Sequence, residues 1–127
     1  MLKIKRAYEA AENDDGKRIL IDRLWPRGVS KVEARIDEWM KDLAPSTELR
    51  QWFGHDTDKW EEFRKRYKKE LASPEGTRLL EDIARRARSG PITLVYGAKD
   101  TEHNNAKVLE EIINEHRTRP AARTPGG

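Results

Sequence analysis

Positively charged side chains gather directly after an apolar stretch of the sequence. Arg23, Arg27 and Lys31 follow the run Ile19-Leu20-Ile21. Guanidinium groups present forked N–H donors that match the oxygens of a phosphate or a carboxylate. A charge so close to a buried strand must be satisfied, so Asp22 is expected to orient one of the arginines. The pattern predicts a pocket in which these three cations hold a small anion. The alternative is that each arginine pairs with a neighbouring acid and only closes the strand end.

A second apolar stretch, 92–96, is also followed by polar residues, among them Lys99 and Asp100. Ligands of open α/β sheets collect beyond the carboxyl ends of the strands. If the two stretches form neighbouring parallel strands, Lys99 joins the arginines in holding the anion. Trp25, Tyr96 and Asp100 are then expected to line the same pocket.

Three residues outside these stretches are further candidates. Asn105 lies three and four residues before Val108 and Leu109, so it faces inward and either braces a loop or contacts the ligand. Arg64 lies on the aromatic side of its predicted helix, where it either contacts the anion or covers the rings. His55 follows a glycine and is the best acid–base candidate, because only histidine titrates near neutral pH without perturbation. A structural role is the alternative for His55.

Several familiar sites do not occur in this sequence. There is no cysteine, and His55, His103 and His116 lack the spacing of metal ligands. His103 is interpreted as a solvent-exposed residue at the start of a helix. Walker A, GxGxxG and GxSxG motifs are also missing. We therefore expect neither a metal nor an organic cofactor.

Three strands are predicted. Leu2 and Ile4 alternate with lysines, which indicates a half-buried strand over 2–8. The stretch 18–25 begins with an unbroken apolar run, typical of a strand covered on both faces, and 92–96 is similar. Because a helical crossover separates these last two strands, they are expected to pair in parallel.

Helices are predicted between and after the strands. Ser30 and Glu33 match a capping box, and Ile36, Trp39 and Leu43 recur at helical spacing, which indicates one helix from Ser30 to Leu43. The free amides at its start would open onto the anion pocket. Further helices are expected at 46–53, from 56 or 57 to 71, from Pro74 onward, and after Asp100.

The elements alternate along the chain and predict an α/β fold: a small sheet with a parallel strand pair, packed by about five helices. One domain is expected over 1–116, followed by a disordered basic tail over 117–127. The tail holds three arginines and no acid, whereas the chain has 26 basic and 23 acidic residues, so the body is neutral. A nucleic-acid partner is therefore not expected. Because no stretch resembles a membrane span or a secretion signal, a cytoplasmic location is expected.

The motif Ile-Asp-Arg-Leu-Trp-Pro-Arg-Gly at 21–28 resembles the signature of the YeaO-like family, domain of unknown function 488. Further matching segments are Glu38-Trp39, 43–46, 48–56, Trp60, Phe63, Arg64, Tyr67, Glu70, Leu71, 93–96, Lys99-Asp100 and 103–106. The resemblance covers about residues 2–115. It implies a small α/β protein inside the cell and gives no catalytic assignment.

Three functions follow as hypotheses. The first is a pocket that binds a small anionic ligand bearing a phosphate or a carboxylate. The second is a hydrolase or transferase that uses the same pocket, with His55 and Asp22 in catalytic roles. The third is a nucleic-acid or protein interaction module that uses the basic tail as an arm.

Overall fold

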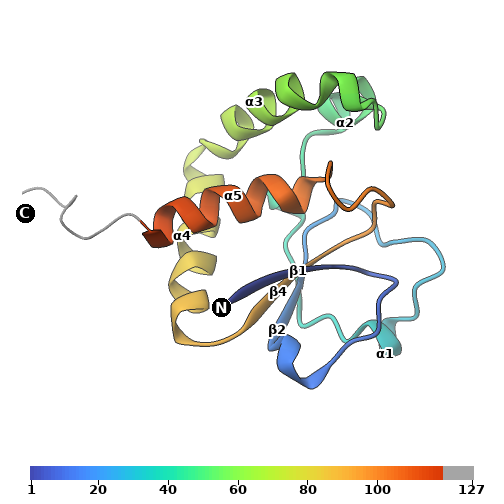
Figure 1. Cartoon of the computed structure of the whole chain (residues 1–127), viewed down its shortest axis with the longest axis vertical. Helices are drawn as coiled ribbons and strands as arrows, with labels where there is room; N and C mark the ends of the chain where they lie inside the picture. The colour runs from blue at the N-terminus through green and yellow to red at the C-terminus, as the bar shows by residue number, and fades with distance from the viewer. Residues whose placement is uncertain (119–127) are drawn as a thin grey trace, which may run out of the picture.

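The computed structural model describes residues 1–118, and side chains through residue 115 (Figure 1). Four strands in this part of the chain form one sheet with the order β1-β4-β2-β3, and every pairing is parallel. The strands are β1 (Leu2–Arg6), β2 (Lys17–Leu20), β3 (Glu38–Trp39) and β4 (Ile92–Tyr96). The predicted parallel pair, β2 and β4, is confirmed and lies at the centre of the sheet.

Helices and single turns of 3₁₀ helix fill the connections between the strands. The helices are α1 (Lys31–Ala34), α2 (Thr47–Phe53), α3 (Trp60–Leu71), α4 (Pro74–Ser89) and α5 (Asn105–Thr118). The 3₁₀ turns are η1 (Asn13–Asp15), η2 (Lys41–Leu43) and η3 (Thr57–Lys59). The predicted α/β class is confirmed. Helix α5 extends two residues into the predicted tail, and the remainder of that tail, 119–127, lies outside the described residues. No helix within residues 1–118 is long and apolar enough to span a membrane.

Strands β2 and β4 are buried on both faces. Ile19, Ile21 and Leu94 pack into the main core, which helices α2 to α5 cover. Leu20 and Val95 point to the opposite face, where the segment 25–36 covers them. All five side chains are inaccessible to solvent, as the unbroken apolar runs predict.

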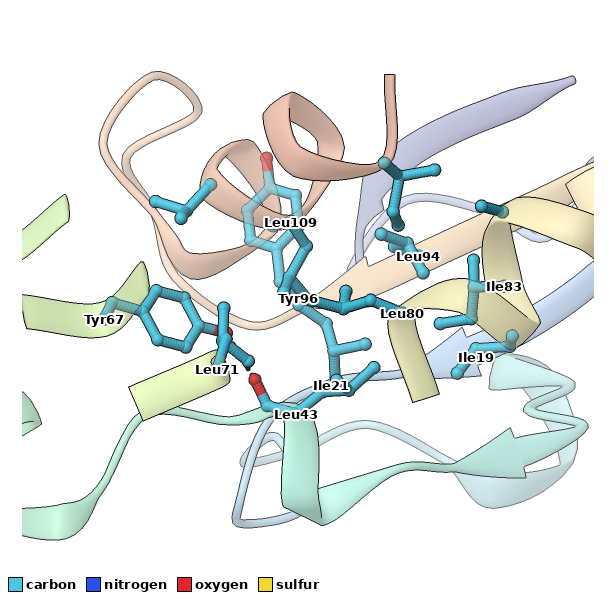
Figure 2. Close-up of a cluster of buried hydrophobic side chains, with 14 of the residues drawn as sticks. Ile19, Ile21, Leu43, Tyr67, Leu71, Leu80, Ile83, Leu94, Tyr96 and Leu109 are labelled. Atoms are coloured by element: carbon cyan, nitrogen blue, oxygen red, sulfur yellow. Dashed lines mark hydrogen bonds between the residues drawn. The ribbon is translucent and has the colours of Figure 1, made fainter. Parts of the chain in front are cut away.

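One buried hydroxyl helps to position α3 over this core (Figure 2). The Tyr67 hydroxyl donates a hydrogen bond to the carbonyl of Leu43 at the end of η2. Burial raises the pKa of Tyr67 well above its ordinary value, so the hydroxyl stays protonated and remains a donor.

Serine side chains cap the predicted helices α2 and α4 at their starts. The Ser46 hydroxyl accepts a hydrogen bond from the Leu49 backbone N–H at 3.1 Å, and the Ser73 hydroxyl accepts one from that of Gly76 at the same distance. Gly54 ends α2 in the left-handed conformation, with a φ of 53°. The predicted bounds of α2 and the predicted start of α4 are therefore confirmed.

The predicted helix from Ser30 to Leu43 is wrong. Ser30 does cap a helix, but α1 ends after one turn at Ala34, and Arg35 adopts a left-handed conformation with a φ of 50°. The chain then extends as β3 and pairs with Ile19 and Leu20 of β2. Without β3 the buried backbone of β2 would lack partners on that side, so the need for hydrogen bonds overrides the helical spacing. Trp39, expected in the helical core, is 37% exposed.

A buried carboxylate links the first two strands. Asp15 is fully buried, and its oxygens lie 2.9 Å from the amine of Lys3, 3.2 Å from that of Lys5 and 2.6 Å from the guanidinium of Arg18. Burial by itself would raise the pKa of this carboxyl. Hydrogen bonds from the Glu12 backbone N–H and from the three cations outweigh burial and hold the pKa well below its ordinary value.

We predict that Asp15→Asn lowers the free energy of unfolding by about 3 kcal/mol, because it leaves three cations without their shared buried counter-charge. Urea denaturation of the two proteins measures the difference. Asp14→Asn is the matched control, since the Asp14 side chain is 83% exposed and its one ion pair with a described residue is to Lys3, at 3.4 Å. Equal unfolding midpoints for the two variants would contradict the prediction.

The lowered pKa of Asp15 also predicts that its contribution to the free energy of unfolding depends on pH. The folded-state pKa of Asp15 lies below the unfolded value of 3.8, so its stabilisation is complete above the unfolded pKa and is lost as the pH falls further. The difference in unfolding free energy between wild type and Asp15→Asn should therefore stay constant down to about pH 5 and shrink below about pH 4. A difference that already shrinks near neutral pH would rule out this origin.

Candidate functional site

A pocket of about 450 Å³ opens at the carboxyl edge of the sheet. The loops after β1, β2 and β4 all leave the sheet on this side (Figure 1). Residues of α2, α3 and the start of α5 complete the pocket lining. The lining residues are Tyr8, 22–27, Ala44, Pro45, Arg50, Gln51, Phe53, His55, Phe63, Gly97, Ala98 and 103–105. The predicted place of the site, beyond the ends of the central parallel strands, is therefore hollow.

Asp22 closes the end of β2 inside this pocket. One carboxylate oxygen accepts a hydrogen bond from the Gly97 backbone N–H at 2.9 Å, and the other accepts one from the Asn105 amide at 3.1 Å. The Asn105 amide also donates to the carbonyl of Ile21 at 3.1 Å. A Cβ atom at position 97 would lie 3.0 Å from the Asp22 carboxylate, so glycine permits this close approach.

Asn105 braces the loop after β2 and also lines the pocket. Asp22 is engaged by the backbone and by an amide rather than by Arg23. Burial raises the pKa of Asp22, and the hydrogen bonds from Asn105 and Gly97, together with the charge of Arg50, only partly oppose this effect. Its hydrogen bonds tie the ends of β2 and β4 to the start of α5.

Two arginines in the pocket have no acidic partner. The Arg23 guanidinium makes one long hydrogen bond, 3.4 Å, to the carbonyl of Ala44, and its Nε is buried without an acceptor. The Nε of Arg50 is buried in the same way. Arg27, the third lining arginine, has an exposed side chain. None of the three forms an ion pair with any described residue.

Three other partly or fully buried arginines of the described chain have carboxylate partners, whereas the partly buried Arg6 donates to the carbonyl of Ala98. Arg18 pairs with Asp15 at 2.6 Å, Arg64 with Glu61 at 2.6 Å, and Arg86 with Asp82 at 3.2 Å. Each of these three charges has a carboxylate partner, although one Nη of Arg18 is buried without an acceptor. Arg23 and Arg50 differ because they combine a buried Nε that lacks an acceptor with the absence of an ion pair to any described carboxylate.

Some predicted site residues lie elsewhere. The Arg64 guanidinium is bound by Glu61 and Glu111, next to a separate hollow along α5, so the expectation that it joins the cluster is wrong. Tyr96 is a buried core residue. Lys31 and Lys99 do not line the pocket, although the Lys31 amine lies 6.0 Å from the ring centroid of Trp25, which does. A strand-end position in the sequence does not say which way a side chain in a loop turns.

The two histidines of the pocket differ in how they are held. His55 lines the pocket with an exposed side chain and a φ of 60°. Its ring lies 6.2 Å from that of Phe53, and it makes no hydrogen bond to a described side chain. His103 has its Nδ1 3.0 Å from a carboxylate oxygen of Asp100, and its ring meets Trp60 edge-on at 5.2 Å. Asp100 thus positions a lining residue and does not line the pocket itself.

Sequence reasoning missed several of the lining residues. The sequence patterns give Arg50 no role, place Tyr8 in the first strand and predict a solvent-exposed His103. One signal for Arg50 was present: it lies three residues before the buried Phe53, hence on the inner side of a short helix. No local pattern indicates that α2 faces the end of β2.

One cluster of acidic residues in the described chain has metal-like spacing. Glu12, Asp14 and Asp15 bring their oxygens within 4.8 Å of one another. The amines of Lys3 and Lys5 already occupy Asp15, so the cluster is explained as part of the ion-pair network.

Comparison with known proteins identifies relatives along almost the whole chain. Residues 1–125 match the family described as "Inactive DUF488-N3 subclade". The chain is 47% identical to the uncharacterized protein YeaO of Escherichia coli over 114 residues, covering 88% of this chain and 96% of YeaO. It is 35% identical over 113 residues to uncharacterized proteins of Mycobacterium bovis and Mycobacterium tuberculosis, covering 89% of this chain and 93% of each relative.

No solved structure shows detectable similarity to the chain. The family match and the identity to YeaO agree with the motif at 21–28, which forms the loop after β2 and much of the pocket wall. The chain therefore belongs to the YeaO-like DUF488 family, in the branch described as the inactive DUF488-N3 subclade.

Proposed function

We propose that this protein binds a small phosphate- or carboxylate-bearing ligand in the pocket at the strand ends, without converting it. The observation that carries the proposal is the state of Arg23 and Arg50. Both are partly buried, both line the same pocket, and neither has a carboxylate partner among the described residues.

Leaving a buried donor without an acceptor is energetically unfavourable. The cost is about 1–3 kcal/mol for each group, and more where the group is charged. A bound anion would supply acceptors to both guanidinium groups after a small rotation of the side chains, and such charge-assisted hydrogen bonds are among the stronger ones in proteins. The ligand would thus supply the hydrogen-bond acceptors that the described protein does not provide to Arg23 and Arg50.

The balance of charge in the pocket also favours an anion. Arg23, Arg27 and Arg50 line it together with one acid, Asp22. The two oxygens of Asp22 are engaged by Gly97 and Asn105, which leaves the guanidinium groups available. A net positive hollow with walls of low polarity concentrates negative ligands.

Two observations support binding over catalysis. A general base usually needs a third group to orient it, and His55 has none among the described side chains. The family to which the chain belongs is described as inactive.

One observation favours the second candidate, a hydrolase or transferase. His103 lines the pocket, and its Nδ1 lies 3.0 Å from a carboxylate oxygen of Asp100, as the oriented base of a catalytic site would.

We predict that Arg50→Gln and Arg23→Gln each weaken the binding of inorganic phosphate by at least about tenfold, because each removes one charge-assisted donor pair. NMR titration of the full ¹⁵N-labelled chain measures the dissociation constants. Arg88→Gln is the control, since Arg88 is an exposed arginine outside the pocket. Wild type that does not bind phosphate or acetate at all, or an Arg88 variant as weak as the other two, would refute the proposal.

The choice between binding and catalysis has its own test. We expect no release of phenol or phosphate when the full chain is incubated with phenyl phosphate, and no hydrolysis of phenyl acetate above the buffer rate. Product formation is followed by absorbance. Turnover that disappears in His103→Gln but persists in His55→Gln would instead establish the hydrolase and assign its base to the Asp100–His103 pair.

A further inference from the structure

The pocket is larger than a simple inorganic anion requires. Its volume of about 450 Å³ corresponds to roughly 15 water molecules in the liquid. Volumes of this size are typical of sites for organic small molecules, about 300–1,000 Å³. A phosphate or acetate ion on the two arginines would leave most of the space to water.

Part of the pocket lining is apolar. Phe53 and Phe63 line the pocket and are themselves almost fully buried. Pro26, Pro45 and Trp25 add further apolar surface. Such a lining with a few polar groups is the usual composition of a site for an organic ligand.

Large apolar side chains also stand exposed at this pocket. The described chain leaves five large hydrophobic residues exposed, and two of them, Tyr8 at 50% and Leu24 at 65%, line the pocket. Isolated exposed apolar residues are common on protein surfaces. Two that share one hollow with unpartnered arginines are available to cover a ligand.

Tyr8 is held in place at this position. Its hydroxyl donates a hydrogen bond to the carbonyl of Arg27 at 2.8 Å, which ties the loop after β1 to the loop after β2. The guanidinium carbon of Arg6 lies 4.9 Å from the ring centroid, and the Nε of Arg6 donates to the carbonyl of Ala98 at 2.9 Å. An aromatic ring fixed in this way offers contact area at little cost in conformational entropy.

We infer that the ligand carries its phosphate or carboxylate on a flat aromatic ring. This inference rests on the proposed anion binding. The anionic group lies on Arg23 and Arg50, and the ring packs against Tyr8 and Leu24. The ring excludes the water that a bare anion would leave in the pocket, and it gains from apolar burial and from contact with the face of an aromatic side chain.

Two matched pairs of probes test the inference on the full chain: inorganic phosphate against phenyl phosphate, and acetate against benzoate. NMR titration gives the dissociation constants, and the indole N–H of Trp25 reports from the pocket. We expect the ring-bearing member of the preferred pair to bind at least about tenfold more tightly than its ringless partner. The pair with the tighter members identifies the anionic group as phosphate or carboxylate.

Variants then locate the ring. Tyr8→Ser and Leu24→Ser should each reduce the preference for the ring-bearing probe over its ringless partner several-fold. Val32→Ser is the control, since Val32 is 84% exposed and does not line the pocket. Leu24 is exposed enough that its replacement should not impair folding, and thermal melts of all variants verify this.

The outcomes distinguish a failure of the aromatic-ligand inference from a failure of the proposed anion binding. Equal affinities within both pairs would overturn the aromatic ligand and leave anion binding in place. A preference for the ring that survives in both Tyr8→Ser and Leu24→Ser would overturn the location of the ring. If none of the four probes binds, anion binding itself fails and the inference fails with it.

Discussion

The site depends on how the Asp22 carboxylate holds the ends of two buried strands together. Strand β2 can pair with β4 only if both remain inside the core, with Ile19 opposite Leu94. Where β2 ends, a charge meets low-polarity surroundings, and the Gly97 N–H and the Asn105 amide satisfy it. These two contacts bring the loop after β4 and the start of α5 to the loop after β2.

Charge is handled in two different ways at this sheet. Around Asp15, the cations of β1 and β2 and the carboxylate neutralise one another inside the protein. At the carboxyl edge, Arg23 and Arg50 form no ion pair with a described carboxylate, and the Nε of each is buried without an acceptor. The chain therefore has the means to pair a buried arginine and does not do so in the pocket. The contrast supports a ligand more strongly than the number of arginines does, because isolated surface cations are common.

Sequence reasoning succeeded where local forces decide the structure. The apolar runs of β2 and β4 and the capping serines of α2 and α4 act over a few residues, so their pattern is visible in the chain itself. It failed at 35–43, where β3 replaces the predicted helix. There, the unpaired backbone of β2 attracts a strand, and a partner that lies about 20 residues away in the sequence overrides the local spacing.

The residues of the candidate site also fall into those that local sequence patterns place and those that only tertiary packing places. The sequence by itself determined the family, the buried strands and the placement of Asp22, Arg23 and Arg27 at a strand end, because these follow from short contiguous patterns. Only the tertiary structure decided that Arg50 joins them, that Arg64 does not, and that His103 faces the same hollow. The strand order β1-β4-β2-β3 and the packing of α2 and α5 bring these residues together or keep them apart. Such contacts join distant parts of the chain, and no local spacing encodes them.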